Sequence, residues 1–338
     1  MQATSRRQFV QTLGAASVAL AAKSEMVWAQ SAEFTLKLGN VFPATHPVNV
    51  RAKEAADAIR QDTHGRVDLQ LYPNSQLGGD GDMLSQVRTG AMDVYVVGLA
   101  LSTLVPAVTI AGVGFAFGDY DHLWAAMDGD LGRYVRNQIA KVGLIPMDKA
   151  WDNGFRHITT STKPIVTPVD LQNLRIRVPS SPLWTSTFKS LGTSPVTVNF
   201  AELYSALQTK IADAQENPLP LVDVGRLYEV QKFCSLTGHM WDGAYVIVNA
   251  RSWGRLPKDL QETVAHHINS AGDGSRSDIA ALTTHLEVDL KAKGLAFNRP
   301  DPALFRAALR NAGYYSEWRK RYGDEAWAFL EKYSGELA

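Results

Sequence analysis

The chain has 338 residues, 34 basic and 34 acidic side chains and one cysteine, so its formal net charge at neutral pH is zero. Such a chain lacks the basic footprint of nucleic-acid-binding proteins and the polybasic clusters that hold proteins on anionic lipid. The single cysteine, Cys234, excludes an intramolecular disulfide and a four-cysteine zinc or iron–sulfur site. We therefore expect a protein stabilised by a large core and, at this length, divided into two domains.

The first residues predict an export signal. Arg6 and Arg7 precede a short apolar run, residues 10–22, and the segment ending at Ala29 has the small-residue pattern of a signal-peptidase site. The apolar run is shorter than the ~20 residues of a membrane span. We interpret residues 1–29 as a signal peptide of the twin-arginine type, with a general secretory signal as the alternative. In both cases the mature protein leaves the cytoplasm.

Strands and helices alternate through most of the mature chain. The spacing of apolar residues predicts, in order, strand 35–40, helix 47–64, strand 66–72, helix 82–89, strand 92–97, a buried segment 108–117, helix 120–142 and strand 144–151. A second series follows, with strand 175–178, helix 183–191, strand 194–198, helix 201–209 and strand 211–215. Alternation of this kind is typical of two doubly wound α/β lobes.

The C-terminal part is predicted to be helical. Apolar residues keep helical spacing over residues 258–293, and as one helix this segment would be roughly 54 Å long at ~1.5 Å per residue. Such a helix is long enough to lie along both lobes. A further helical region, residues 302–337, closes the chain.

The sequence offers little for catalysis. It has no complete dinucleotide fingerprint, no phosphate loop, no nucleophile elbow and no His-Glu-x-x-His pair. His266 and His267 are adjacent and point about 100° apart on a helix, so they cannot share a metal ion. Asp80 and Asp82 begin like a calcium loop, but the later ligands are missing. We expect no cofactor, no metal and no enzymatic activity.

A carboxylate-binding site is predicted around Arg177. Arg175 and Arg177 share one face of the strand 175–178, and Pro179 ends that strand. Ligands of open α/β sheets bind beyond the carboxyl ends of the strands, which places Arg177 nearer the ligand than Arg175. A planar guanidinium can bind a carboxylate through two hydrogen bonds. We expect Arg177 to bind a small organic acid and Arg175 to be an ordinary solvated arginine.

Several motifs resemble the solute-binding subunits of TRAP (tripartite ATP-independent periplasmic) transporters of the DctP type. They are Tyr72-Pro73-Asn74-Ser75-Gln76-Leu77-Gly78, Thr89-Gly90-Ala91-Met92-Asp93, Leu174-Arg175-Ile176-Arg177-Val178-Pro179, the segment 201–209 and the segment 213–218. The resemblance covers nearly the whole mature chain. It implies a periplasmic protein with a periplasmic-binding-protein-like fold, whose ligand cleft lies between two lobes. It also implies delivery of the ligand to TRAP membrane permease subunits.

The resemblance also implies roles for individual residues. Arg177 matches the arginine that binds the ligand carboxylate, Arg156 a second cleft arginine, and Asn217 an amide that hydrogen-bonds the same carboxylate. Phe200 matches an apolar wall and Asp80 a polar contact from the first lobe. The implied lobes are residues 30–153 with 243–282, and residues 154–242 with 283–338, the long helix being shared. We expect a monomer.

The part of the ligand beyond its carboxylate is less well specified. Trp151 and Trp241 are candidates to stack on a sugar or aryl face, and Asp152, Asn153 and Asp242 could meet hydroxyl groups. A sugar acid or hydroxy acid is our first expectation, with an aromatic or 2-oxo monocarboxylate as the alternative. Gly98 and Leu99 stand where some relatives have an acidic residue, which argues against a sialic-acid-like ligand. A binding protein of an ABC importer and an exported enzyme remain the alternatives from other classes.

Overall fold

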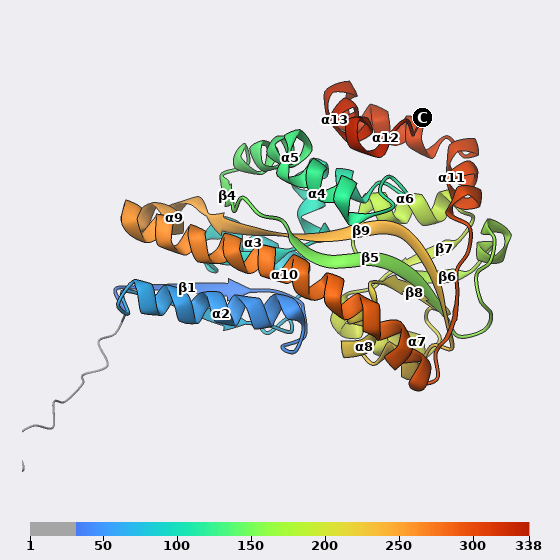
Figure 1. Cartoon of the computed structure of the whole chain (residues 1–338), viewed down its shortest axis with the longest axis horizontal. Helices are drawn as coiled ribbons and strands as arrows, with labels where there is room; N and C mark the ends of the chain where they lie inside the picture. The colour runs from blue at the N-terminus through green and yellow to red at the C-terminus, as the bar shows by residue number, and fades with distance from the viewer. Residues whose placement is uncertain (1–31, 338) are drawn as a thin grey trace, which may run out of the picture.

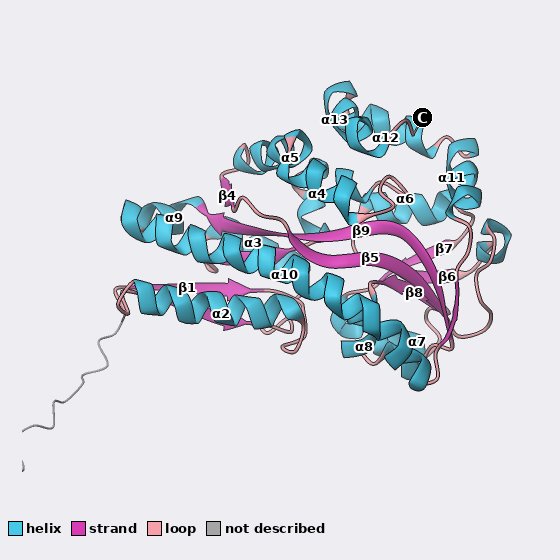
Figure 2. Ribbon diagram, in the orientation of Figure 1, coloured by secondary structure: helices cyan, strands magenta, loops and turns pink. Residues whose placement is uncertain are grey.

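The structure is a computed structural model and describes residues 32–337. The predicted signal peptide, residues 1–29, lies outside the described residues. Helices and strands alternate along the chain, and the helices lie around the strands (Figures 1 and 2). The strands are β1 (Phe34–Gly39), β2 (Val67–Tyr72), β3 (Val94–Val97), β4 (Leu144–Pro146), β5 (Trp151–Thr160), β6 (Arg175–Val178), β7 (Ser194–Thr197), β8 (Ala214–Asn217), β9 (Phe233–Asn249) and β10 (Ala296–Asn298). The helices are α2 (Pro47–Asp62), α3 (Asp80–Thr89), α4 (Tyr120–Asp128), α5 (Asp130–Ala140), α6 (Pro182–Ser190), α7 (Leu203–Gln208), α8 (Leu219–Val224), α9 (Ala250–Arg255), α10 (Lys258–Ala292), α11 (Pro302–Asn311), α12 (Tyr314–Tyr322) and α13 (Asp324–Ser334).

The strands form one connected sheet that serves both lobes. Their order is β2-β1-β3-β9-β5-β8-β6-β7, and β10 and β4 pair with the beginning and the end of β9. The strands β1, β2 and β3 are parallel in one lobe, and β6, β7 and β8 are parallel in the other. The antiparallel strands β5 and β9 lie between these two groups. The predicted class, two α/β lobes with a long helix along both, is confirmed.

The two longest strands of the described chain were not expected from the sequence. The strand β5 has 10 residues and β9 has 17, and nearly every residue of β9 is buried. A strand that is covered on both faces shows no alternation of polar and apolar residues, so the period-2 signal is lost. The prediction of one strand over residues 144–151 was wrong, because β4 ends at Pro146 and β5 begins at Trp151.

The strand β5 is irregular where it passes between the lobes. Its register with β9 shifts between Asp152 and Phe155, and Gly154 has a φ of 106°. This backbone conformation favours glycine, which has no Cβ atom to clash. Bulges of this kind change the direction of neighbouring side chains. Asn153 and Arg156, on either side of Gly154, both line the cavity described below.

The predicted helix over residues 120–142 is two helices. Gly129 ends α4 and precedes α5, and its backbone N–H donates to Ala126 O. A Cβ atom at position 129 would lie 2.5 Å from Ala125 O and 2.5 Å from the hydroxyl oxygen of Tyr333 in α13. The close approach of the α4 backbone at Ala125, with Tyr333 of α13 also near, therefore requires glycine at this break.

The helix α10 is a single helix of 35 residues, as predicted. Its buried residues include Leu260, Val264 and Ile268 near the start and Leu286 and Leu290 near the end. It packs on α2 in one lobe and on α8 in the other, and it crosses β5 in between (Figure 1). Gly272 faces the Trp151 ring at the crossing, where a Cβ atom would lie 2.9 Å from Trp151 Nε1. Over residues 32–337, none of the helices combines the length and the apolar composition that a membrane crossing requires.

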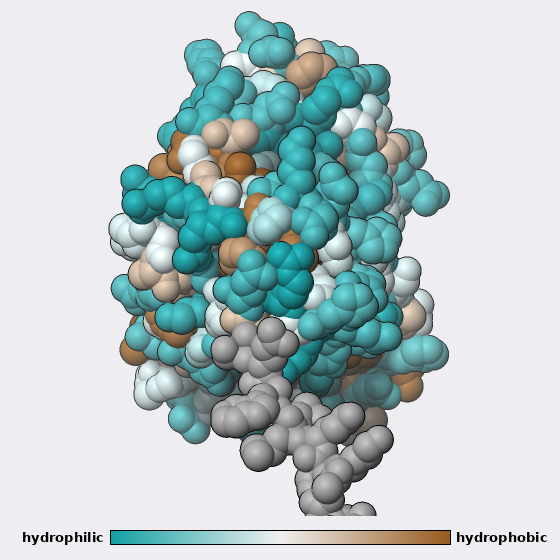
Figure 3. Space-filling model, turned by 90° about the vertical axis from the view of Figure 1, so that its left-hand side faces the viewer, coloured by the Kyte–Doolittle hydropathy of each residue, from teal (hydrophilic) through white to brown (hydrophobic). Residues whose placement is uncertain are grey.

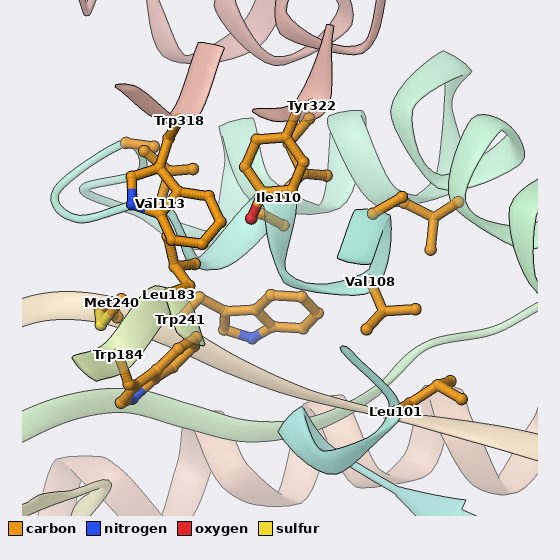
Figure 4. Packing of buried hydrophobic residues seen from close by; sticks show 14 of the residues in the cluster. Leu101, Val108, Ile110, Val113, Leu183, Trp184, Met240, Trp241, Trp318 and Tyr322 are labelled. Atoms are coloured by element: carbon orange, nitrogen blue, oxygen red, sulfur yellow. The ribbon is translucent and has the colours of Figure 1, made fainter. Parts of the chain in front are cut away.

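The apolar core consists of three clusters of buried side chains. The largest contains Leu183, Trp184, Met240, Trp241 and Trp318, drawn in Figure 4. Cys234 lies in the smallest cluster and is fully buried, as expected of a packing residue. The face of the molecule in Figure 3 is mostly hydrophilic, with apolar residues in small separate groups. The apolar residues of the chain are thus used mainly in the core between sheet and helices.

Candidate functional site

A cavity of about 60 Å³ lies between the lobes, at the carboxyl ends of strands from both. One wall is polar and comes from β5, β6, β8 and β9, with Asn153, Arg156, Arg177, Asn217 and Asp242. The facing wall is largely apolar. It consists of Val41, Phe42, Gly98, Leu99 and Ala100, together with Asp80 at the start of α3. We call these the polar wall and the apolar wall. Phe200 and Leu221 close the space between them.

Arg177 is buried in the polar wall without an acidic partner. Only 2% of the residue is exposed, and Nε donates a hydrogen bond to Val198 O at 2.8 Å. Within residues 32–337 its guanidinium forms no salt bridge. Burial, and then the nearby charge of Arg156, lower its pKa to about 10. The side chain is therefore still charged at neutral pH, and in this largely desolvated place Glu216, Asp80 and Asp242 balance its charge only without direct contact.

Arg156 lies in the same wall, but it is fully paired. Its Nη2 donates to Glu216 Oε1 at 2.7 Å and to Asn217 Oδ1 at 3.1 Å, its Nε donates to Glu216, and its Nη1 donates to Asp242. Although burial opposes ionisation, the charges of these two carboxylates raise the pKa of Arg156. The guanidinium is thus occupied by the protein itself. Its Nη2 also donates to Glu216 O at 2.6 Å, and its Cζ lies 5.8 Å from the centroid of the Trp184 ring.

The strand β8 positions Asn217 through a chain of buried amides. Asn217 Nδ2 donates to Gln215 Oε1, and Gln215 Nε2 donates to Thr159 Oγ1 at 2.7 Å on the neighbouring strand β5. The register that pairs His157 with Asn217 and Thr159 with Gln215 brings these groups together. An amide that is 1% exposed and held on both sides has a fixed orientation. Nδ2 keeps a second N–H for another acceptor.

The apolar wall contributes one polar side chain from α3. Asp80 Oδ1 accepts a hydrogen bond from the Tyr95 hydroxyl at 2.7 Å. Burial raises the pKa of Asp80, and the Tyr95 hydrogen bond and the charge of Arg177 act in the opposite direction. Phe200 follows β7 and lies between two apolar clusters with one side on the cavity. Both residues line the cavity, and the ligand contacts that the resemblance implies for them stay predictions.

The structure does not place Trp151 and Trp241 at the cavity, so the expectation that they stack on the ligand is corrected. Trp151 is 1% exposed and packs under α10, and Trp241 is 3% exposed in the largest core cluster (Figure 4). Trp241 Nε1 donates to Asp152 Oδ1 at 2.8 Å, and its ring meets Trp124 edge to face at 5.5 Å. Both lie on strands that run through the core, and their side chains point into the core.

The remaining polar candidates divide into two groups. Asn153 and Asp242 line the cavity, whereas Asp152 is buried behind it as the acceptor of the Trp241 and Gly154 N–H groups. Burial raises the pKa of Asp152 to about 6 and also raises that of Asp242.

Arg175, as expected, lies at the surface, where it pairs with Asp213 at 2.8 Å.

Sequence reasoning did not identify Glu216 and His239, which lie behind the polar wall and support it. Glu216 Oε2 accepts hydrogen bonds from Arg156 Nε and from Trp184 Nε1, and it lies 3.2 Å from His239 Nε2. Glu216 directly precedes Asn217 in the sequence, and this position was the available signal. The structure shows that it is fully buried, and a buried glutamate requires a cationic partner.

Comparison with known proteins places this geometry in a family. Residues 38–319 match the family model described as bacterial extracellular solute-binding protein, family 7, named DctP. The chain belongs to the DctP family. One relative is the 2,3-diketo-L-gulonate-binding periplasmic protein YiaO of Escherichia coli strain K12, 33% identical over 279 residues, which are 82% of this chain and 85% of that protein. Another is the uncharacterized protein y4mM of Sinorhizobium fredii, 36% identical over 274 residues, or 80% of this chain but only 50% of that longer protein.

A solved DctP-type structure extends the comparison to three dimensions. The TRAP periplasmic solute-binding protein from Polaromonas sp. JS666, bound to D-erythronate, has a TM-score of 0.85 and 30% sequence identity, over 90% of this chain and 100% of that one. DctP membership confirms the resemblance seen in the sequence, and the predicted periplasmic location agrees with it. The chain is a solute-binding protein with a binding-protein fold.

Proposed function

We propose that this protein captures a small organic acid, a sugar acid or hydroxy acid, by its carboxylate between Arg177 and Asn217. The observation that carries the proposal is the buried guanidinium of Arg177, which has no acidic partner within residues 32–337. A buried charge is stable only when it is paired, so the site is complete only with an anion present. Asn217 Nδ2 has a free N–H for the same carboxylate.

The lining of the cavity, partly apolar and partly polar, supports a sugar acid or hydroxy acid as the ligand. Phe200, Leu99 and Leu221 offer contacts for carbon atoms, and Asp80, Asn153 and Asp242 offer contacts for hydroxyl groups. The relatives that bind 2,3-diketo-L-gulonate and D-erythronate point in the same direction. An aromatic acid is less well supported, because Trp151 and Trp241 lie in the core and provide no stacking face.

The ligand is then delivered to a TRAP-type membrane permease, and the protein acts as a monomer without catalysing a reaction. The lobes are residues 30–153 with 243–282, and residues 154–242 with 283–338. The irregular place in β5 at Gly154 and the facing segment of β9 at Gly243 lie next to these boundaries, which supports a hinge there. Closure of the lobes on the ligand produces the form that the permease recognises.

The test is a thermal-shift screen of the mature protein against a library of small organic acids, followed by titration of the best ligand. Losing one partner of a buried charge pair costs roughly 2–5 kcal/mol. At about 1.4 kcal/mol per decade, Arg177→Ala should weaken binding from about thirtyfold to several thousandfold. Arg175→Ala is the matched control, two residues away on the same strand and paired at the surface. Equal affinity of the Arg177→Ala and Arg175→Ala proteins would contradict the proposal.

A further inference from the structure

One oxygen of Asp242 is left open toward the cavity. The residue lies in β9 and is 5% exposed. Its Oδ2 accepts hydrogen bonds from Asn153 Nδ2 at 2.7 Å and from Arg156 Nη1. Its Oδ1 accepts no hydrogen bond from any group within residues 32–337. A carboxylate that is fixed through one oxygen presents the other oxygen in a defined direction.

Gly98 provides the space in front of this open oxygen. It directly follows β3, whose last residue Val97 pairs with Tyr245 of β9, so Gly98 lies beside Asp242 and Gly243. A Cβ atom on Gly98 would be 3.7 Å from Asp242 Oδ1 and 3.6 Å from Gly243 O. Both atoms are acceptors, so the group that fills this space has to be a hydrogen-bond donor.

The charges around the cavity also favour a hydrogen-bond donor at this point and disfavour a second carboxylate. Arg156 is already paired with Glu216 and Asp242, and Arg177 is the one cavity-lining cation of the described chain without an acidic partner. Once a ligand carboxylate occupies Arg177, a second carboxylate would meet the negative charges of Asp80 and Asp242 without a free cation of the described chain to balance it. Like charges at short distance in a desolvated site are strongly unfavourable.

We infer that Asp242 Oδ1 and the space over Gly98 form a hydroxyl-binding subsite that makes the protein selective for hydroxylated monocarboxylates over dicarboxylates and unsubstituted acids. The inference rests on the proposed function, because it takes the Arg177 carboxylate contact as the anchor. A hydroxyl group needs one acceptor, whereas an ammonium group has three N–H bonds to satisfy. Asp242 Oδ1 and Gly243 O are the two acceptors at this point, one fewer than an ammonium group requires, so a hydroxyl is the better match.

The test compares four acids with the same four-carbon chain by isothermal titration calorimetry. D-erythronate carries hydroxyl groups, butanoate carries none, succinate carries a second carboxylate, and 4-aminobutanoate carries an ammonium group. We expect D-erythronate to bind the unmodified protein at least tenfold more tightly than each of the other three. Equal or tighter binding of butanoate, succinate or 4-aminobutanoate would overturn the inference, as would a failure of D-erythronate to bind.

Two variants assign the selectivity to the subsite. Gly98→Ala places a methyl group in front of Asp242 Oδ1, in ordinary van der Waals contact with its neighbours. It should weaken the binding of D-erythronate tenfold or more and the binding of butanoate less than threefold. Asp242→Asn has the same shape as the native residue. It should also lower the ratio of the D-erythronate affinity to the butanoate affinity. An unchanged ratio in Gly98→Ala overturns the inference even if Asp242→Asn fails to fold.

The same experiment separates the subsite from the anchor. If Arg177→Ala binds D-erythronate as well as the unmodified protein does, the proposed function fails. If Arg177→Ala loses all four acids while Gly98→Ala affects them equally, the carboxylate anchor stands and the hydroxyl subsite is wrong.

Discussion

The two walls of the cavity are built in different ways. In the polar wall, Arg156, Asn217 and Asp242 are held by buried hydrogen bonds to one another and to Glu216 behind them. In the apolar wall, Leu99 and Ala100 contribute shape, and Asp80 has one hydrogen bond, to Tyr95. The difference teaches that, under the proposed function, the carboxylate end of the ligand meets a fixed arrangement. The choice among acids then depends on Asp242 Oδ1 and on the space over Gly98, where the two walls meet.

Removing a charge from the polar wall should have the largest effect on stability. Glu216→Ala leaves Arg156 with Asp242 as its one remaining carboxylate partner in the described chain, and breaking a buried pair costs about 3–5 kcal/mol. Urea denaturation should show a loss of this size in the free energy of unfolding. Glu229→Ala, which breaks a surface pair with Arg226, is the control and should change stability little. Similar losses in the two variants would mean that the polar wall is not interlocked.

Asp152, directly behind the polar wall, should make the free energy of unfolding depend on pH. The pKa of Asp152 is about 6 because of burial, above the value of ~3.9 in an unfolded chain. The folded state therefore holds this proton more tightly, so the group favours folding at low pH and this contribution is lost as the pH rises through 6. Two units of pKa correspond to about 3 kcal/mol.

Asp152→Asn cannot titrate, so the difference in unfolding free energy between the unmodified protein and this variant should change by about 2 kcal/mol between pH 4 and pH 7. The comparison has to be a difference, because His46 and His157 have pKa values lowered by burial to about 3 and act in the opposite direction. A difference that is independent of pH would show that Asp152 is not desolvated in solution.

The smallest change in ligand affinity is expected from a substitution in the apolar wall. Leu99 is partly buried, and Leu99→Ala removes carbon atoms from the cavity surface without breaking a polar contact. It should weaken ligand binding by about fivefold, or about 1 kcal/mol, with little change in the midpoint of urea unfolding. A loss of affinity as large as that of Arg177→Ala would remove the distinction between the two walls.

The positions of Arg177 and Asn217 at the cavity could be predicted because each belongs to a short local pattern. Arg177 ends a strand before Pro179, and Asn217 ends another before Pro218, so both lie at the carboxyl ends of strands. The tryptophans could not be assigned in this way. Whether Trp241 faces the cavity or the core depends on the register of β9, and a strand covered on both faces has no alternation from which to read it.

Similar reasoning explains which parts of the fold were predicted. The helix α10 has a long apolar stripe, and its bounds were found nearly to the residue. The break at Gly129 is fixed by the close approach of its own backbone to Ala125 O, with the Tyr333 hydroxyl of α13 also near, and the apolar spacing of residues 120–142 reports neither contact. The partner of Arg156 was missed because Glu216 is distant in sequence.

The position of β9 in the sheet has a consequence for how the chain is made. The strand β3 lies between β1 and β9, and Val94 of β3 pairs with Val248, which is synthesised much later. Until then the edge of β3, with four fully buried residues, is open to pairing with other chains. A contact between segments so far apart also forms slowly, because a long loop has to close first. A chain interrupted before residue 249 should therefore aggregate rather than fold as a half-molecule.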